Sequence, residues 1–327
     1  MKALQKAAAS KADTKRRKPA TSAAPAQRRA EKAPKNVVSM KVAITHPDRI
    51  VYPAMEITKS EVAEYYAAVA PWLLREAMRR PLSIVRCPGE IEKACFFQKH
   101  EESSLGDAVH SAKIKEKNRK TARYLYIDSP RGLVQLAQMN AIELHVWGAT
   151  IDDPDHCDRL VFDLDPGAGV AWKRIAAAAR DVRAALKKTQ LQSWLRVSGG
   201  KGLHVVVPLR PAAEWNAAHA FAEMLARTLA AQSPQNYVAV AGEKNRENRI
   251  FIDYLRNARG ATSIANYSLR ARDHAGVALP IGWEELRRIS SADAFTLHDV
   301  PGLLKRRRRD PWQDIGKIEQ ALPAQPS

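Results

Sequence analysis

The expected fold starts from one stretch of the sequence, Leu160-Val161-Phe162-Asp163-Leu164-Asp165-Pro166-Gly167. Large apolar side chains alternate with the other positions, and a period of two in β-branched and aromatic residues predicts a strand. Residues two apart on a strand point to the same side, so Asp163 and Asp165 project together while the opposite face can pack on a core. The Pro166-Gly167 pair ends the strand.

Two carboxylates held side by side on a strand repel each other, and a cation between them favours their ionised forms. Oxygen ligands of this kind suit Mg²⁺ or Mn²⁺. An isolated Asp-x-Asp at the end of a strand is more often a solvated surface feature. The metal interpretation therefore depends on what else the sequence places nearby.

A glycine-rich turn, Ser198-Gly199-Gly200-Lys201-Gly202-Leu203-His204, lies between two short apolar runs. Glycines let a backbone approach an anion closely, and Ser198, Lys201 and His204 add hydrogen-bond donors. The turn is a candidate phosphate cradle, although an ordinary hairpin turn has the same composition. It is not a Walker A loop, because no Gly-x4-Gly-Lys-Ser/Thr is present.

A third acidic residue, Asp253, lies in another short β-prone run, Arg249-Ile250-Phe251-Ile252-Asp253-Tyr254. A third carboxylate can bridge a second metal ion, and two metals about 3.5–4 Å apart stabilise the attacking and leaving oxygens of a phosphoryl displacement. Three aspartates, a phosphate loop and many cationic residues together favour nucleotidyl transfer on a nucleic acid.

The composition supports an anionic partner. The chain has 327 residues and a formal net charge of +18, and its isoelectric point is about 9.9, which is typical of proteins that bind nucleic acid. Residues 1–37 contain almost no large apolar side chains, so we expect a disordered basic tail or linker there. No apolar run is long enough to span a membrane.

Cysteine usage and the N-terminus bear on the compartment. Three cysteines, Cys87, Cys95 and Cys157, do not suggest a disulfide framework, and we expect a reducing, cytoplasmic setting. The N-terminus lacks the apolar region of a secretory signal.

Several further elements can be predicted along the chain. A capping box at residues 58–61 opens a helix, whose first turn would place Lys59 near free N–H groups suited to a phosphate, and Pro71 should kink or divide that helix. Residues 121–128 and 132–136 look like a hairpin. Phe96 and Phe97 stand beside basic residues, where they can stack on bases or simply fill a core.

Six motifs, in order along the chain, resemble the polymerase module of bacterial ATP-dependent DNA ligase D, a branch of the archaeo-eukaryotic primase superfamily. They are Thr45–Pro53, Phe96–His100, Val161–Gly167, Ser198–His204, Ile252–Asn257 and Tyr267–Arg272. The resemblance implies an α+β fold in which an RRM-like mixed sheet carries the catalytic aspartates and is flanked by helices, with a second, smaller α/β subdomain. The resemblance covers roughly residues 41–315. We expect one polymerase/primase domain at residues 38–315, followed by a flexible C-terminal tail at residues 316–327.

The resemblance also implies roles for individual residues. The metal-binding catalytic carboxylates would be Asp163, Asp165 and Asp253. The residues that hold the incoming nucleoside triphosphate would be Ser198, Lys201, His204, Arg246 and Arg270, with His145 near the sugar. The DNA-binding residues would be Phe96 and Phe97 at the templating base, and Arg49 and Lys59 at the 5′-phosphate of the downstream strand, with His46 where some members have Asn.

The activity implied by the resemblance is template-directed polymerisation that fills gaps and extends ends during non-homologous end joining. It would use two metal ions per site, Mn²⁺ or Mg²⁺, with ribonucleotides preferred as substrates. The implied partners are double-stranded DNA ends, gapped DNA with a 5′-phosphate, Ku, and a DNA ligase. Because the sequence shows no ligase nucleotidyl-lysine motif, we expect the ligase to be a separate chain or a part of this chain that is missing from the sequence.

Two alternatives remain open from the sequence. The chain could be a catalytically idle scaffold that binds DNA ends through Arg49 and Lys59, or a primase that starts synthesis without a primer. Metal-dependent primer extension separates the first alternative from a polymerase, and synthesis on circular single-stranded DNA without a primer tests the second. We expect the protein to be cytoplasmic and associated with the nucleoid.

Overall fold

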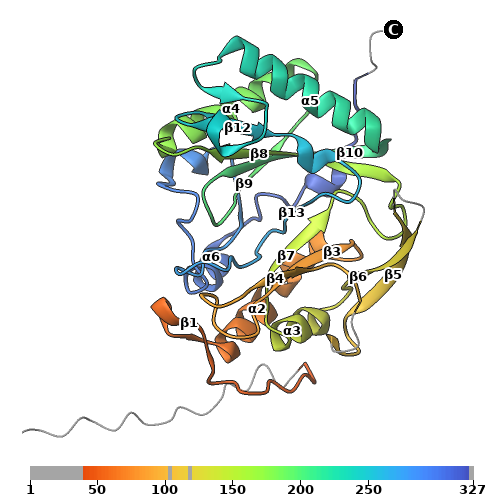
Figure 1. Cartoon of the computed structure of the whole chain (residues 1–327), viewed down its shortest axis with the longest axis vertical. Helices are drawn as coiled ribbons and strands as arrows, with labels where there is room; N and C mark the ends of the chain where they lie inside the picture. The colour runs from red at the N-terminus through yellow and green to blue at the C-terminus, as the bar shows by residue number, and fades with distance from the viewer. Residues whose placement is uncertain (1–39, 102–104, 117–119, 324–327) are drawn as a thin grey trace, which may run out of the picture. The chain divides into compact units, whose positions relative to one another are not determined.

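The computed structural model describes residues 40–101, 105–116 and 120–323. The predicted basic tail at residues 1–37 lies outside these ranges. Two six-stranded sheets organise the described chain, and each has its own pair of helices (Figure 1). This arrangement is the mixed α+β architecture expected from the sequence.

The first sheet is built around the Asp-x-Asp strand. Its order is β11 (Tyr237–Val238), β12 (Ile250–Asp253), β8 (His156–Pro166), β10 (Leu203–Glu214), β9 (Trp194–Val197) and β14 (Leu279–Ile281). Strands β11 and β12 are parallel, and the other neighbours are antiparallel. Helices α4 (Trp172–Lys188) and α5 (Trp215–Gln232) lie against β8 and β10 in the upper part of Figure 1.

The second sheet has the order β13 (Thr262–Ile264), β7 (Ala141–Trp147), β3 (Leu82–Arg86), β6 (Thr121–Tyr126) and β5 (His110–Lys115), and β4 (Phe96–Gln98) pairs with β3. Helices α2 (Lys59–Ala77) and α3 (Pro130–Gln138) pack on each other beside it. A small ribbon of β1 (Ile50–Tyr52) and β2 (Ile57–Thr58) precedes α2, and α6 (Asp299–Arg306) lies near α2.

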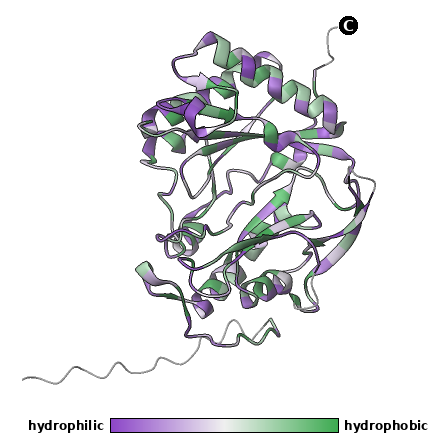
Figure 2. Cartoon of the chain, in the orientation of Figure 1, coloured by the Kyte–Doolittle hydropathy of each residue, from purple (hydrophilic) through white to green (hydrophobic). Residues whose placement is uncertain are grey.

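Apolar residues of both sheets and of the helices form one large core cluster. Figure 2 shows hydrophobic residues concentrated on the central strands of the lower sheet, whereas α4 and α5 carry hydrophobic and hydrophilic residues together. This mixture is the pattern of helices that bury one face and expose the other. Among the described helices, none combines the length and apolar character needed to cross a bilayer.

One local prediction is wrong. Residues 132–136 are not the second strand of a hairpin but belong to α3, because Pro130 starts the helix and the Ser129 hydroxyl caps it by accepting from the Gly132 amide at 3.3 Å. Strand β6 pairs with β5 instead. Pro71 lies inside α2 without dividing it, and the capping box that opens this helix is present as predicted.

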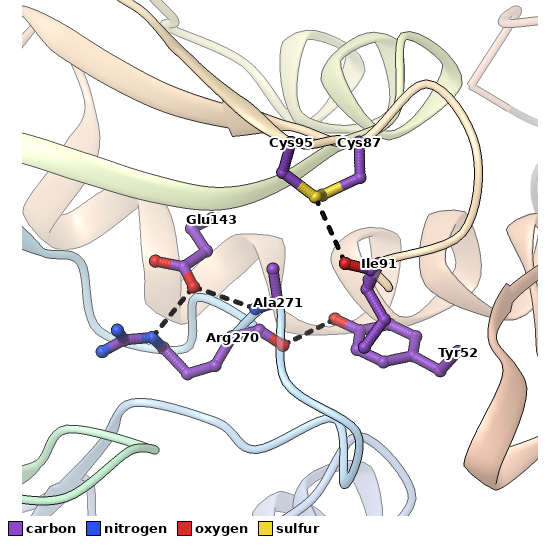
Figure 3. Close-up of a disulfide and its surroundings, with 7 residues drawn as sticks. All are labelled: Tyr52, Cys87, Ile91, Cys95, Glu143, Arg270 and Ala271. Carbon is purple, nitrogen blue, oxygen red and sulfur yellow. Dashed lines mark hydrogen bonds and ion pairs between the residues drawn. A yellow bond between two sulfur atoms is a disulfide. The ribbon is translucent and has the colours of Figure 1, made fainter. Parts of the chain in front are cut away.

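The prediction from the cysteines is also corrected. Cys87 and Cys95 form a disulfide with their Cα atoms 4.3 Å apart, as Figure 3 shows, whereas Cys157 is free and buried. Strands β3 and β4 are antiparallel with Arg86 opposite Phe96, so the next residues along this register, Cys87 and Cys95, face each other.

Part of the predicted C-terminal tail is described and lies against β10. The Gln320 carbonyl accepts from the Arg210 amide at 2.8 Å, and the Gln320 side chain bonds to the backbone of Gln192 and Pro208. The short helix η6 (Ile315–Lys317) precedes this contact.

Candidate active site

Four polar residues form a row across the first sheet. In the strand register, Asp253 of β12 is opposite Asp163 of β8, Asp163 is opposite His204 of β10, and His204 is opposite Arg196 of β9. Cross-strand partners project from the same face of a sheet. Asp165 lies two residues beyond Asp163 on β8 and therefore shares that face, so the fold brings the three predicted carboxylates together.

Arginine side chains balance these carboxylates. The Arg256 Nε atom lies 3.0 Å from Asp253 Oδ2 and 3.5 Å from Asp163 Oδ2, so one guanidinium bridges the first and third aspartates. Arg246 of η3 (Glu243–Arg246) makes a short contact with Asp165. Asp253 is 7% exposed, which means that its charge is largely removed from water.

The three carboxyl groups differ in acidity. Burial and repulsion from Asp163 raise the pKa of Asp165, and burial raises the pKa of Asp253 against the opposing charge of Arg256. Burial also acts on Asp163, but the neighbouring His204 and Arg256 hold the pKa of Asp163 well below its usual range. Asp163 therefore carries the negative charge most readily, while its two neighbours gain most from an added cation.

The donor set fits hard divalent cations. Three carboxylates from two adjacent strands share one face, and oxygen is the ligand preferred by Mg²⁺ and Mn²⁺. Within the described ranges, no three His, Cys, Asp or Glu side chains are already grouped closely enough to hold an ion. The guanidinium groups of Arg246 and Arg256 occupy the carboxylate oxygens, so binding of a divalent ion requires these arginines to move.

The glycine-rich turn lies at the end of β8, next to the acidic residues. The Ser198 hydroxyl accepts hydrogen bonds from the Gly200 and Gly202 amides at 3.3 and 3.2 Å. A Cβ atom on Gly202 would lie 2.1 Å from the Leu164 carbonyl oxygen, so only glycine permits this close approach to β8. Lys201 at the tip of the turn is exposed.

A cavity of about 730 Å³ adjoins this turn. Its lining includes Gly200, Lys201, Arg246 and Pro166, and α4 contributes Trp172. Its wall carries three cationic side chains, Lys201, Lys244 and Arg246, which give this space a means to bind phosphate. Three acidic side chains, Glu243, Glu247 and Asp293, also line it.

A second charged group joins the two sheets beside the turn. Arg270 donates to the Ser198 carbonyl at 3.0 Å and to Glu143 of β7 at 3.2 Å, while the Ala271 amide also donates to Glu143 (Figure 3). His145 Nε2 lies 2.8 Å from the other Glu143 oxygen. Burial opposes ionisation of Glu143, but the His145 hydrogen bond and Arg270 lower its pKa to about 2.

The two predicted stacking residues are exposed. Phe96 and Phe97 on β4 are 43% and 69% exposed, which is unusual for large aromatic side chains. The Phe97 ring lies 5.5 Å from the His145 ring, centroid to centroid, so this aromatic pair reaches the edge of the site.

The third predicted group gathers around the first residue of α2 and the segment that precedes it. Lys59 is only 3% exposed, and its Nζ atom donates to the Thr45 carbonyl at 3.0 Å. Burial and the nearby charge of Arg49 lower the pKa of Lys59 to about 8. The Arg49 Nε atom is buried and has no hydrogen-bond partner in the described part of the chain. His46 is exposed, and its carbonyl accepts from the Arg49 amide at 3.1 Å.

The expectation that Lys59 lies near free N–H groups is wrong. The amides of Lys59 and Ser60 bond to the carbonyls of Arg49 and Pro47, and the Glu61 amide bonds to the Thr58 hydroxyl. Backbone carbonyls of the turn before β1 therefore accept hydrogen bonds from the first amides of the helix. Two cationic side chains remain as the means to attract a phosphate here.

Three residues of the site were not singled out as functional from the sequence: Glu143, Arg196 and Arg256. Arg256 follows Asp253 by three positions, and Glu143 precedes His145 by two on one strand, so their spacing was a usable signal. The pairing of Arg196 with Glu76 carried no such signal, because Glu76 is 120 residues away, although its other partner, His204, follows it by eight positions.

Comparisons with known proteins identify the family of this chain. The family model for the LigD primase-polymerase domain matches residues 58–312. The chain belongs to this family. A multifunctional non-homologous end joining protein LigD from Pseudomonas aeruginosa is 37% identical over 285 residues, covering 86% of this chain, and one from Mycolicibacterium smegmatis is 35% identical over 248 residues, covering 75%.

The chain spans 34% and 32% of these two LigD proteins, about a third of their length. A solved structure described as the polymerase domain from Mycobacterium tuberculosis ligase D in complex with DNA matches with a TM-score of 0.78 and 31% identity. The match covers 84% of this chain and 98% of that one. The fold is therefore that of the LigD polymerase domain, within the primase superfamily, as the resemblance implied.

Proposed function

We propose that the protein is a template-directed nucleotidyltransferase that fills gaps and extends ends during non-homologous end joining of double-strand breaks. The observation that carries this proposal is the convergence of Asp163, Asp165 and Asp253 on one sheet face beside the Ser198–Gly202 turn. Membership of the LigD primase-polymerase family and the non-homologous end joining names of its relatives support the same activity.

The three aspartates would hold two divalent ions, Mn²⁺ or Mg²⁺. Such ions, when bound, lower the pKa of a primer 3′-hydroxyl and neutralise charge on the leaving pyrophosphate. The lowered pKa of Asp163 favours its ionised form, and ion binding would favour the ionised forms of Asp165 and Asp253, whose carboxyl pKa values are raised. Arg246 and Arg256 would release the carboxylates and become available to phosphate oxygens.

The nucleoside triphosphate would lie along the glycine-rich turn. Lys201, His204 and Arg270 face or flank this turn, and the adjoining cavity of about 730 Å³ offers room for phosphate groups near Arg246. Ser198 shapes the turn by accepting from two of its amides. His145, held by Glu143, would face the sugar. We infer that the sugar site accepts ribonucleotides in preference to deoxyribonucleotides.

DNA would contact two further places. Phe97, with 69% of its surface exposed, and Phe96 would stack on the templating base. Arg49 and Lys59, with the exposed His46, would bind the 5′-phosphate across a gap, since two close cations in a partly dry site attract a dianion strongly. The DNA complex of the Mycobacterium tuberculosis polymerase domain supports this partner.

The remaining partners follow from the repair pathway named for the relatives. A LigD-type polymerase domain would act beside a DNA ligase, in the same or another chain, and with Ku at DNA ends. We infer a cytoplasmic, nucleoid-associated protein on the ground of this DNA substrate. The cysteines no longer contribute to that inference, because two of them are paired.

The test is primer extension on a duplex with a short gap and a 5′-phosphate, comparing Mn²⁺ with Mg²⁺ and ribo- with deoxynucleotides. We expect metal-dependent extension that EDTA abolishes and that Asp163→Ala reduces to background while DNA binding is kept. Normal extension by Asp163→Ala would refute the proposal. Absence of metal-dependent extension by the wild-type protein, with tight binding of DNA ends, would favour the idle scaffold.

A further inference from the structure

A buried arginine lies behind the candidate active site. Arg196 is fully buried, with 0% of its surface exposed, and it occupies the end of the polar row on β9. Burial of an arginine is costly unless its donors are all satisfied. The contacts of its five N–H donors therefore show what this side chain holds in place.

All five donors have acceptors. The Nε and Nη2 atoms lie 3.2 and 3.1 Å from His204 Nδ1, and Nη2 also lies 3.0 Å from the Ser263 hydroxyl. The Nη1 atom donates to Glu76 at 3.0 Å and to the Asn266 side-chain oxygen at 3.3 Å. Two of the donors thus converge on a single ring nitrogen of His204.

This geometry decides the protonation of the imidazole. Guanidinium nitrogens are donors only, so His204 Nδ1 must be an acceptor and cannot carry hydrogen. The neutral ring then has its proton on Nε2. That atom lies 3.3 Å from Asp163 Oδ1, so the proton is directed towards the acidic residues.

We propose that Arg196 is a positioning residue that fixes His204 as the Nε2–H tautomer and orients it as a hydrogen-bond donor towards Asp163 and the phosphate site. The part of this role that concerns a bound phosphate rests on the proposed function. The tautomer itself does not depend on any activity.

Glu76 makes the arrangement rigid. It comes from the last turn of α2, beside the second sheet, and accepts from Arg159 of β8 at 2.8 Å and from the Asn266 amide at 2.6 Å as well as from Arg196. The orientation of a side chain in the first sheet is therefore determined by a carboxylate from a helix packed on the second. A lysine at position 196 could reach His204 but would lack the planar fork that contacts Glu76 and His204 together.

The direct experiment is a long-range ¹H–¹⁵N NMR spectrum of the full chain labelled with ¹⁵N at histidine. The chain has nine histidines, and the His204 signals are those missing from His204→Gln. We expect the Nε2–H pattern at pH 7.5 in the wild-type protein. An Nδ1–H pattern would overturn the inference and leave the proposed polymerase activity intact.

Variants test the positioning role. Arg196→Met should allow both tautomers and raise the nucleotide KM about 10- to 100-fold, the effect of losing one charge-assisted hydrogen bond, while kcat changes less. Arg196→Lys should recover part of the loss. The matched control is Arg80→Met, which removes another buried arginine, 6% exposed, that pairs with Asp158 and does not contact His204.

Arg80→Met should keep the His204 tautomer and the nucleotide KM. Equal effects of Arg80→Met and Arg196→Met on KM would show that general destabilisation is responsible and would overturn the role. A His204 tautomer in Arg196→Met that is unchanged from the wild type would also overturn the positioning role. If Arg196→Met does not fold, the wild-type spectrum still decides the tautomer. A wild-type enzyme without extension activity would contradict the proposed function but not the tautomer.

Discussion

Replacing Glu76 by Gln is expected to be the most destabilising isosteric change in this part of the chain. The Glu76 side chain is 5% exposed and accepts from Arg159, Arg196 and the Asn266 amide at 2.6–3.0 Å. Glutamine keeps one acceptor oxygen but replaces the other with an NH₂ group, which would face N–H groups that now donate to the carboxylate. It also removes the carboxylate that pairs with the buried Arg196, whereas Arg159 keeps Asp158 at 3.3 Å.

The magnitude follows from those contacts. Breaking a buried ion pair by removing one partner costs about 3–5 kcal/mol, because the remaining charge is left uncompensated. We expect a loss of this size in the free energy of unfolding, measured by urea denaturation at pH 7. The control is Glu90→Gln, whose partner Lys93 is 3.3 Å away with a 65% exposed side chain, and which should cost at most about 1 kcal/mol.

The same variant carries a pH signature. Burial opposes the charge on Glu76, but Arg196 and Arg159 lower its pKa in the folded protein. The contribution to stability is therefore complete above the unfolded pKa of about 4.3 and is lost as the pH falls below it towards the folded pKa. Stability of the wild-type protein should fall more steeply than that of Glu76→Gln in this window. A loss below about 1 kcal/mol at pH 7, or parallel pH curves, would refute the reasoning.

Three further outcomes are expected. Lys59→Met should abolish the preference for gapped DNA with a 5′-phosphate over gapped DNA with a 5′-hydroxyl. In the wild type this preference should weaken as the pH rises through about 8, the pKa of Lys59, because the ammonium loses its charge. Fluorescence anisotropy of the two DNAs at pH 7 and pH 9 measures the effect of the variant and the effect of pH. Phe97→Ala should weaken binding of a templating single strand by about 1–3 kcal/mol without lowering the melting temperature, since the ring is 69% exposed. Binding of the single strand by Phe97→Ala as tight as by the wild type would contradict stacking. Gly202→Ala should displace the turn from β8 and raise the nucleotide KM, because the new Cβ would lie 2.1 Å from the Leu164 carbonyl oxygen. The control is Gly316→Ala, which should leave KM unchanged, because a Cβ there would have no atom within 4 Å.

Much of the site could be predicted because its signals are local. Alternation around Asp163 and Asp165 determines a strand with both carboxylates on one side, and glycines in the following turn reveal a close approach to another group. The third carboxylate, Asp253, stands in a similar short β-prone run, and the similarity of several motifs to the ligase D polymerase module supports its grouping with the other two. The comparisons confirm that family and fold.

What the sequence could not show depends on contacts between distant segments. The pairing of Cys87 with Cys95 required the β3–β4 register, and α3 formed where a short apolar run could equally have been a strand. Arg196 meets Glu76 only because α2 packs across to the first sheet. Local periodicity thus determined which residues share a strand face, whereas only the tertiary structure decided which charges are buried together, because burial and pairing of charges arise from the packing of elements that are remote in the chain.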